Sequence, residues 1–313
     1  MSETFELRDL GDRRVLSVDG REYVTSYSAR VVQMLIDRKG ARRTPPYFDY
    51  KRTRGDHFLR PLFRWLAEQR RDRLRVLEVG CSFGHITEWL AERPEVAEIY
   101  TFDTDATFVE IVRAKREELG LKSVAEVRRL TNEETCALPW GDGVFDLVLA
   151  LGVVEHLPER HRRTQVDEHW RVLARGGHIA FLDTPNRWFP LETHSVGLPL
   201  VQWLPPRAAW QYARLGRWHK FGATPYADFV ADGTGWRNAT YRECLPSAGT
   251  AGVEDVTERA GYGWRFFRGT ARSKTRRALL PAFAVAVAAL RAVAQPPSLC
   301  LPYLNLVFRR TSQ

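Results

Sequence analysis

The sequence predicts an α/β fold in which a mostly parallel sheet is covered by helices on both faces. Two observations predict it. Between residues 74 and 184, apolar runs of strand length alternate with segments of helical periodicity, a pattern typical of parallel strands joined by crossover helices. The first apolar run also ends in a glycine-containing turn that leads into a helix. With 44% hydrophobic and 27% charged residues, the 313-residue chain has the composition of a globular protein.

The first 70 residues are expected to form a basic, mostly irregular leader that ends in a helix. Alternating runs around an Asp-Gly pair predict a small hairpin over residues 15–24. Apolar residues at helical spacing predict the helix over residues 56–70.

The elements of the sheet region follow in order. Strands are expected over residues 74–80, 98–103, 124–130, 145–151 and 178–184. Helices are expected over residues 86–93, 106–120 and 163–177, the last ending at a Gly-Gly pair. Two later segments, 252–261 and 303–310, have the composition of further strands.

These elements divide the chain into four segments. Residues 1–70 are the leader and its helix, and residues 71–186 are the expected cofactor-binding core. Residues 187–250 break the α/β alternation and are rich in tryptophan and proline, so we expect a cap or substrate wall there, with a plain packing insertion as the alternative. Residues 251–313 are expected to complete the sheet and to carry a basic, apolar segment.

The strongest local pattern is the run VLEVGCSFG, residues 76–84. Gly80 and Gly84 carry no Cβ, so the backbone of this turn can approach a ligand closely. The helix that follows offers unpaired N–H groups to an anionic group. Asp103 ends the second strand, at the position where a ribose hydroxyl would bind. The alternative is a tight turn without a ligand.

The identity of a bound cofactor depends on charge and on glycine spacing. A dinucleotide turn would have glycine where this chain has Ser82 and His85. Glu78 places a negative charge at the strand end, which opposes a pyrophosphate and suits a cation. S-adenosylmethionine (SAM) carries an ammonium and a sulfonium, so the residues favour SAM over NAD or FAD.

Residues 78–84 resemble motif I of class I SAM-dependent methyltransferases, although Ser82 stands where the family usually has glycine. Residues 138–159 and 169–186 resemble the later stretches of the same superfamily through its fourth and fifth strands. The resemblance spans about residues 70–190. It implies a Rossmann-like fold with a seven-stranded, mostly parallel sheet and an antiparallel last strand.

The resemblance also assigns cofactor contacts. It places Glu78 and Gly80 near the methionine moiety, Asp103 at the ribose hydroxyls, and Glu134 near the adenine amine, where the adjacent Glu133 is an alternative. The further contacts that it implies are Cys81, Ser82 and Gly84 in the turn, Thr104 beside the adenine, and Leu151 at the end of the fourth strand.

Methyl transfer to a hydroxyl requires positioning and usually a general base. His156 follows the fourth strand, His194 lies past the fifth strand, and Asp183 closes the fifth strand. These three residues are the catalytic candidates. Each also has a structural interpretation: a loop-organising histidine, an exposed loop histidine and a turn-forming carboxylate.

A metal-dependent reaction is not expected. Some related O-methyltransferases carry Glu-x-x-Glu-His at this place, where two carboxylates and an imidazole can hold a divalent ion. Here Gly152 stands at the first carboxylate position, followed by Glu155 and His156. We therefore predict no metal ligands.

The C-terminal segment is basic and partly apolar. Residues 259–313 contain ten Lys or Arg and no Asp or Glu, which suits an anionic partner or a solvated basic face. The apolar run 278–290 is shorter than the ~20 residues that span a bilayer, so it predicts a core helix or a membrane-surface helix. Nucleic acid is not favoured, because no binding motif accompanies the charge.

The sequence predicts no signal peptide, and its four scattered cysteines suit a reducing compartment. We therefore expect a cytoplasmic enzyme, with membrane association as an open alternative. The predicted activity is SAM-dependent methyl transfer to a hydroxyl of a small molecule, a glycan or a lipid-linked acceptor. A SAM-binding sensor or scaffold without turnover is the main rival. A nucleotide-dependent oxidoreductase is disfavoured by Ser82 and His85.

Overall fold

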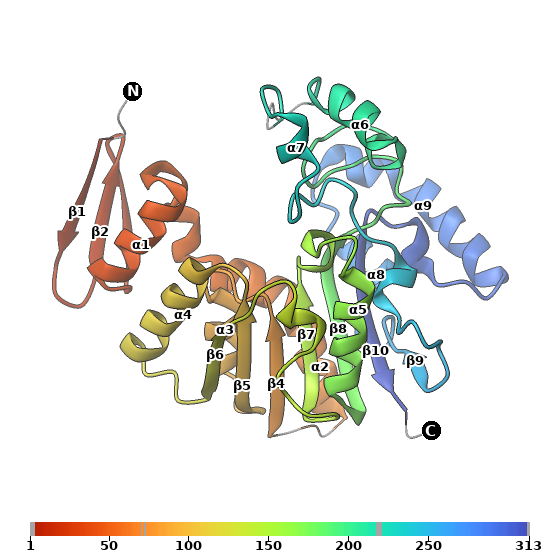
Figure 1. Ribbon diagram of the computed structural model, residues 1–313, viewed down its shortest axis with the longest axis horizontal. Helices are drawn as coiled ribbons and strands as arrows, with labels where there is room; N and C mark the ends of the chain where they lie inside the picture. Colours follow the sequence, from red (N-terminus) through yellow and green to blue (C-terminus); the bar gives the residue numbers. More distant parts are fainter. Residues whose placement is uncertain (1–3, 70, 72, 217–220, 312–313) are drawn as a thin grey trace. The chain divides into compact units, whose positions relative to one another are not determined.

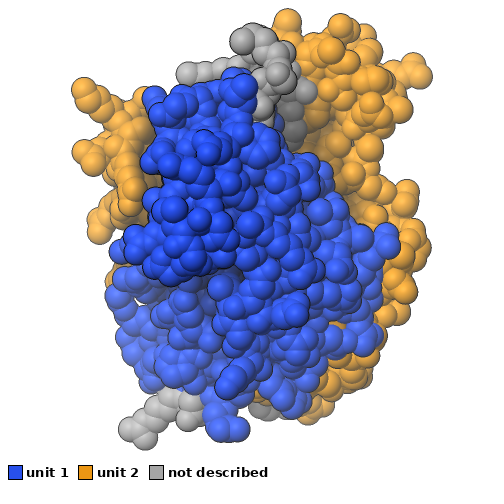
Figure 2. All heavy atoms as spheres, turned by 90° about the vertical axis from the view of Figure 1, so that its left-hand side faces the viewer, with its two compact units in different colours: residues 1–130 blue, residues 131–313 orange. Residues whose placement is uncertain are grey.

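The computed structural model describes residues 4–311 except residues 70, 72 and 217–220. The chain forms two compact units, residues 1–130 and residues 131–313 (Figure 2). The strands of the central sheet are β4 (Leu74–Val79), β5 (Val96–Asp103), β6 (Val124–Arg129), β7 (Phe145–Leu151), β8 (Leu173–Pro185), β9 (Val253–Asp255) and β10 (Tyr303–Arg310). Their order is β6-β5-β4-β7-β8-β10-β9 (Figure 1). The predicted seven-stranded α/β sheet is confirmed.

Unit 1 begins with a small antiparallel sheet of β1 (Phe5–Asp9), β2 (Arg14–Val18) and β3 (Arg21–Thr25). The predicted hairpin is confirmed, but the prediction of an irregular leader is wrong. Helix α1 (Ala29–Lys39) follows, with Ser28 as its N-cap. The leader is ordered because the apolar residues of α1 have helical spacing and share one face. The four buried residues of α1 pack in one cluster with Phe83, Ile111 and Ala114. The short helices η1 (Ala41–Arg43), η2 (Pro45–Phe48) and η3 (Lys51–Gly55) follow α1.

The rest of unit 1 has the expected α/β alternation. Helices α2 (Asp56–Glu68), α3 (His85–Ala91) and α4 (Ala106–Glu118) lie where helices were predicted. Arg70, with which the first of these was expected to end, lies outside the described residues. Strand β5 pairs in parallel with β4 and with β6. Because the strands are parallel, their carboxyl ends meet at one edge of the sheet.

In unit 2, β7 pairs in parallel with β8, and α5 (Arg162–Val172) connects them. The expected end of this helix at Gly176-Gly177 is wrong, because the chain is already extended at Leu173. The two glycines lie in an irregular part of β8. A Cβ on Gly177 would come within 2.9 Å of two backbone oxygens, those of Ala174 and Asp146. The glycines therefore permit a close strand contact and do not end the helix.

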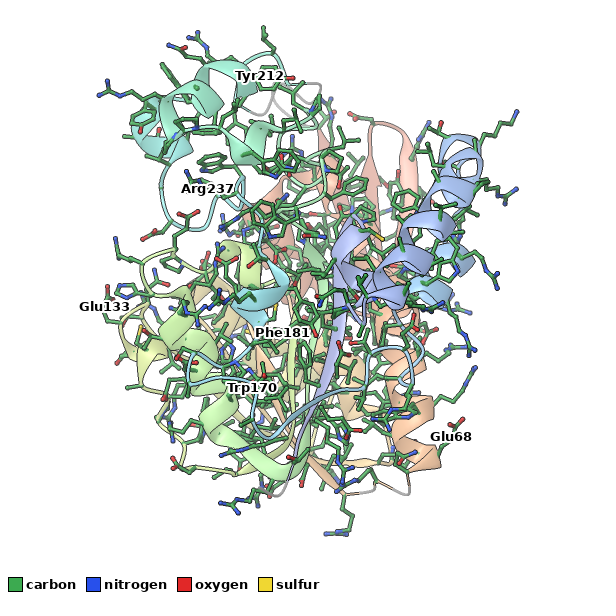
Figure 3. The ribbon with its side chains drawn as sticks, turned by 90° about the vertical axis from the view of Figure 1, so that its right-hand side faces the viewer. Glu68, Glu133, Trp170, Phe181, Tyr212 and Arg237 are labelled. Atoms are coloured by element: carbon green, nitrogen blue, oxygen red, sulfur yellow. The ribbon has the colours of Figure 1, made fainter. Side chains whose placement is uncertain are left out.

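Strand β10 pairs antiparallel with β8 and with β9, as expected for the last strand. Trp170 of α5 and Phe181 of β8 (Figure 3) both pack on Phe308 of β10, with ring centroids 6.0 Å and 6.5 Å from it. The guanidinium of Arg310 donates to the carbonyl oxygens of Trp170 and Arg171, in the last turn of α5, and of Leu173, its C-cap residue. Those carbonyls have no partner within the helix, so Arg310 caps this end of the helix.

In the described residues of 187–250, the helices are short: η6 (Val201–Trp203), α6 (Pro206–Ala213), α7 (Tyr226–Phe229) and η7 (Tyr241–Cys244). It has an apolar cluster of its own, in which Phe229 stacks on Trp236 with ring centroids 4.9 Å apart. Tyr212 on α6 and Arg237 after the cluster mark this segment in Figure 3. Residues 217–220 of the predicted cap lie outside the described residues.

The C-terminal apolar run lies in α9 (Lys274–Ala292), between α8 (Trp264–Gly269) and η8 (Pro297–Cys300). Val287 is its one buried residue. The core-helix interpretation of this run is therefore wrong. Among the described residues, no helix is long and apolar enough to cross a membrane.

Candidate functional site

The turn after β4 is built from left-handed backbone. Gly80 and Gly84 have φ angles of 74° and 75°, and Ser82 has a φ of 45°. A Cβ on Gly84 would lie 2.9 Å from Cγ2 of Val112 on α4, so both conformation and packing require glycine there. Ser82 adopts the same backbone region at a position where the resembled family usually has glycine.

Asp103 holds this turn to the end of β5. Its Oδ2 accepts a hydrogen bond from the Ser82 amide at 2.9 Å, and its Oδ1 accepts one from the Asp105 amide at 3.0 Å. Burial raises the pKa of Asp103 above its ordinary value, against the effect of these amides. The structure thus brings Asp103 and the turn together. The pairing of Asp103 with a ribose stays a prediction.

Glu78 is a buried carboxyl group at the end of β4 and is 3% exposed. Its Oε2 accepts a 2.6 Å hydrogen bond from the Thr87 hydroxyl. Burial raises the pKa of Glu78 to about 7, since desolvation penalises the carboxylate more than the hydroxyl donors stabilise it. A cation bound near Glu78 would favour its ionised form.

The neighbouring turn residues have structural contacts through their backbone amides. The amides of Gly80 and Cys81 both donate to the carbonyl oxygen of Phe102, at 3.1 Å and 3.0 Å. The Cys81 side chain is buried, and burial raises its pKa well above the ordinary value, so it stays a neutral thiol. Thr104 is exposed beside Asp103. Their predicted cofactor contacts stay predictions.

A buried ion pair supports the helix that follows the turn. Lys115 of α4 lies 2.6 Å from Glu88 of α3, and both side chains are almost fully buried. The Tyr27 hydroxyl donates to the same carboxylate at 3.0 Å, and Lys115 Nζ lies 4.1 Å from the centre of the Tyr27 ring. This cluster fixes α3 behind the turn through groups that were not predicted as functional.

Unit 2 contains two further residues that are predicted to contact the cofactor. Leu151 ends β7, and the adjacent Gly152 amide donates to the Leu182 carbonyl at 2.8 Å. Glu134 begins the short helix η4 (Glu134–Cys136), and its Oε2 accepts the Thr131 amide at 2.7 Å. This contact gives Glu134 a local structural role, and its predicted contact with adenine stays a prediction. Glu133, the alternative, is exposed (Figure 3).

The structure brings two of the three catalytic candidates together in unit 2. His156 lies in η5 (Val154–His156), directly after β7, and His194 lies in the loop that follows β8. Their Nε2 atoms are 3.2 Å apart, and their ring centroids are 5.0 Å apart. The two residues are 38 positions apart in the sequence, so only the fold makes them neighbours.

The hydrogen bonds of the histidine pair assign its tautomers. His156 Nδ1 lies 2.7 Å from the Gly233 carbonyl oxygen and must donate to it. In the neutral pair, His156 Nε2 is then the acceptor, and His194 donates from Nε2. The Oε1 of buried Glu155 lies 3.9 Å from His156 Nε2 and favours a positive charge on that ring.

The loop that carries His194 is organised by Glu192. This carboxylate is fully buried and accepts hydrogen bonds from four consecutive backbone amides, residues 194–197, at 2.6 to 3.0 Å. Such a cluster of amides stabilises a carboxylate and fixes the loop. Glu192 is thus a positioning residue for His194.

A second loop covers the other side of the histidine pair. A Cβ on Gly235 would lie 2.9 Å from His156 Cε1 and 3.4 Å from His194 Cδ2. Because Gly235 also has a φ of 73°, only glycine allows this approach. A cavity of about 340 Å³ lies beside this loop and is lined by Glu155, Arg162 and Trp236, among others. Buried Arg162 donates to the carbonyl oxygens of Glu155 and Leu157 and so holds η5 at the cavity wall.

Asp183, the third catalytic candidate, lies near the end of β8 with a φ of 53°. Its amide donates to Oδ1 of Asn305, which sits at an irregularity in β10. Left-handed backbone in a non-glycine residue costs energy and is common in functional sites. Tyr303 lies close by: its hydroxyl accepts from Thr193 at 3.2 Å. Burial raises the pKa of Tyr303, and the charge of Asp183 raises it further.

A metal ion has one possible site among the described residues. Glu155, His156 and His194 each offer a ligand atom, and these atoms lie within 4.8 Å of one another. A carboxylate and two imidazoles form a donor set suited to zinc or another divalent transition metal. The sequence predicted no metal ligands because it compared only residues that are close along the chain.

Three residues of this region were not predicted as functional: Glu192, Gly235 and Tyr303. Glu192 stands two residues before His194, and Gly235 belongs to a Gly-x-Gly turn, so both had weak local signals. Tyr303 had none, because it begins the last strand, more than 100 residues after His194.

Comparisons with known proteins agree with the fold. Residues 77–181 match the family model Methyltransf_11, described as a methyltransferase domain. Over 109 residues the chain is 34% identical to a phosphatidylethanolamine N-methyltransferase of Cereibacter sphaeroides and 29% identical to methyltransferase GfsG of Streptomyces halstedii. Each match covers 35% of this chain, and they cover 50% and 37% of those relatives, so the chain matches half of their length or less.

Among solved structures, a SAM-dependent methyltransferase from Clostridium acetobutylicum is 17% identical, with a TM-score of 0.37. That match covers 46% of this chain and 57% of the other. The cyclase SpnF is 19% identical, with a TM-score of 0.42, over 81% and 82% of the two chains. The family match agrees with the predicted resemblance over the methyltransferase domain, residues 77–181.

Proposed function

We propose that this chain, whose residues 77–181 match a methyltransferase domain, is a class I enzyme that transfers a methyl group from SAM to a hydroxyl of an acceptor. One observation carries the proposal. The domain match coincides with the left-handed turn from Gly80 to Gly84 and with Asp103, which accepts an amide of that turn. This combination places glycine backbone and a carboxylate at the ends of parallel strands, where ligands bind in such sheets.

In this proposal, the residues of unit 1 bind the cofactor. Asp103 accepts hydrogen bonds from the ribose hydroxyls, and the turn approaches the ligand closely because its glycines have no Cβ. Glu78 counters the ammonium charge. Bound SAM supplies a methyl group on a positively charged sulfur, which leaves as a neutral thioether.

The histidine pair in unit 2 removes the acceptor proton. His194 accepts the hydroxyl proton at Nδ1 while its Nε2 proton passes to His156 Nε2, 3.2 Å away. Charge then rests on His156, where buried Glu155 and the Gly233 carbonyl stabilise it. Such a relay removes a proton at neutral pH because imidazole titrates near that pH. Asp183 and Tyr303 are then positioning groups for the acceptor.

The acceptor class follows from the chemistry of unit 2. A relay of two imidazoles suits a hydroxyl, which must lose a proton as the new bond forms. We propose a hydroxyl of a small molecule, a glycan or a lipid-linked molecule. One relative is named for a lipid amine substrate, so lipids with amine and with hydroxyl groups both belong in an acceptor panel.

Calorimetric titration with S-adenosylhomocysteine tests the cofactor assignment. We expect wild-type protein to bind and Asp103→Ala to bind about 100-fold more weakly, since hydrogen bonds to a charged group are lost. Asp12→Ala, which changes an exposed carboxylate of the same unit, is the matched control and should bind as wild type. A folded wild-type protein that binds no S-adenosylhomocysteine would contradict the proposal.

The rival interpretation, a sensor or scaffold, predicts binding without turnover. Transfer of a labelled methyl group from SAM to any member of the acceptor panel contradicts that rival. Binding without transfer to any member of a broad panel favours it.

A further inference from the structure

The outward face of α9 has an unusual composition for a surface helix. From Ala278 to Leu290 every residue is apolar, and most of these side chains are exposed. Val285 is 71% exposed and Leu279 is 49% exposed. A solvated helix normally presents charged or polar residues on that face. The apolar stretch of α9 is about 20 Å long, at 1.5 Å per residue.

The inward face of α9 already has its partners. Val287 is buried, and the Phe283 ring packs on Phe267 of α8 with centroids 4.7 Å apart. On its other side, the Phe283 ring stacks on Phe189, with centroids 6.0 Å apart. Figure 1 shows α9 beside α8 in unit 2. The helix is therefore anchored by one face, and its apolar outward face is a separate feature.

Positive charge gathers at the N-terminus of α9. Its first turn contains basic residues and no acidic residue, the reverse of what the helix dipole favours. From α8 to the first turn of α9, the exposed cations are Arg265, Arg268, Arg272, Lys274 and Arg277. None of these five joins an ion pair within the described part of the chain, whereas Arg291 at the other end pairs with Glu258 at 2.6 Å. An anionic partner would stabilise this end of the helix.

We propose that α9 docks unit 2 on the surface of an anionic lipid bilayer. An apolar face enters the boundary between headgroups and acyl chains, and the cations at one end contact the phosphates. The helix would lie in the interface, which agrees with the lack of any described helix able to span a membrane. A second copy of the chain fits less well, because two such faces would bring their unpaired cations together without an acidic partner.

Trp188 is a further exposed apolar side chain, next in sequence to a residue that contacts α9. It is 60% exposed, and that neighbour is Phe189. Its ring lies 6.4 Å from that of Trp203, which is also exposed. Indole rings favour the region between headgroups and acyl chains. Residues 188–194 lead from this contact to His194, so a lipid-linked acceptor could reach the histidine pair from the bilayer; this last step rests on the proposed function.

Sedimentation with vesicles tests the docking. The full chain is mixed with vesicles of phosphatidylcholine alone or of phosphatidylcholine with phosphatidylglycerol. We expect binding to the anionic vesicles, weakened by salt. Val285→Glu combined with Leu279→Glu should lower the partition coefficient at least about tenfold. Arg272→Gln combined with Lys274→Gln should lower it about thirtyfold, and only on anionic vesicles.

Leu215→Glu is the matched control, because Leu215 is an apolar residue of unit 2 that is 74% exposed and lies away from α9 in the sequence. It should bind as wild type. Circular dichroism and S-adenosylhomocysteine binding report whether each variant is folded, and they separate a failure of docking from a failure of the cofactor assignment.

Two results would overturn the docking proposal. One is a failure of the vesicle assay: either the wild-type chain does not sediment with anionic vesicles, or the variants of α9 sediment as the wild type does. The other is a dimer in sedimentation velocity that Val285→Glu dissociates while vesicle binding is absent, which assigns the face to a second copy.

Discussion

The turn after β4 in unit 1 and the histidine pair in unit 2 are built in different ways. The turn consists of five consecutive residues, and its conformation is set by backbone angles at Gly80, Ser82 and Gly84. The pair depends on three separate segments: η5, the Glu192 loop, and the loop at Gly233–Gly235. The first site depends mainly on its own backbone, with Asp103 as a support from β5, whereas the second depends on contacts from all three segments.

The largest expected effect is on the pair itself. His194→Ala and His156→Ala should each lower kcat about 100- to 1,000-fold, because either change interrupts the proposed relay. The double variant should be little worse than either single variant, since the two residues act as a unit. Rapid measurement of methyl transfer on the identified acceptor tests this.

S-adenosylhomocysteine affinity should be unchanged in these variants, and His161→Ala, in the same unit, is the control. Additive losses would argue against the relay. A wild-type activity that a chelator abolishes and a divalent metal restores would assign Glu155, His156 and His194 to a metal site instead.

The second effect tests the dependence of the pair on its supports. Glu192→Ala leaves four amides, two buried and two partly buried, without their acceptor and should lower the free energy of unfolding by about 3 kcal/mol. Glu192→Gln keeps one acceptor oxygen and should cost less. Denaturant unfolding measures both. Glu133→Ala, an exposed carboxylate of the same unit, should change stability by less than about 0.5 kcal/mol. Equal stability of Glu192→Ala and wild type would show that Glu192 does not fix the loop that carries His194.

The third effect concerns the turn in unit 1. Gly84→Ala should destabilise the protein by about 2 kcal/mol, because its φ of 75° and the 2.9 Å approach to Val112 both oppose a Cβ. Ser82→Gly should be neutral or stabilise by less than about 1 kcal/mol, since glycine adopts a φ of 45° more easily. Thermal unfolding of the two variants separates them. A stable Gly84→Ala protein would show that the turn can relax.

The smallest expected effect is a pH dependence. Burial raises the pKa of Glu78 to about 7 from an ordinary 4.5. The native state therefore binds more protons than the unfolded state between those values, so this group lowers stability as pH rises through that window. An ammonium group bound beside Glu78 favours the carboxylate, so the affinity for S-adenosylhomocysteine, which carries an ammonium, should rise about tenfold from about pH 6 to about pH 8.

Glu78→Gln keeps the size and an acceptor for Thr87 but cannot ionise. Calorimetry at the two pH values should give the same S-adenosylhomocysteine affinity for this variant. If the affinity changes with pH equally in wild type and variant, Glu78 is not the group that causes the pH dependence.

The two regions also differ in how far the sequence predicted them. The strand, the glycine turn and Asp103 were all predicted, because strand length, glycine positions and a carboxylate at a strand end are local properties. The end of α5 was mispredicted, because the Gly-Gly pair that usually ends a helix instead permits the contact of Gly177 with the backbone of Asp146. Helix α1 was missed, although its apolar spacing is regular.

The sequence by itself therefore determined the α/β class, the order of the strands along the chain and the glycine turn after β4. Each follows from the spacing of apolar residues and glycines within a few turns of chain. Only the tertiary structure decided that His194 lies against His156, that Glu192 holds its loop and that Tyr303 lies near Asp183. It also decided that the apolar run of α9 is exposed, because burial depends on what packs against a helix, and a helix of the same composition can lie in a core or on a surface.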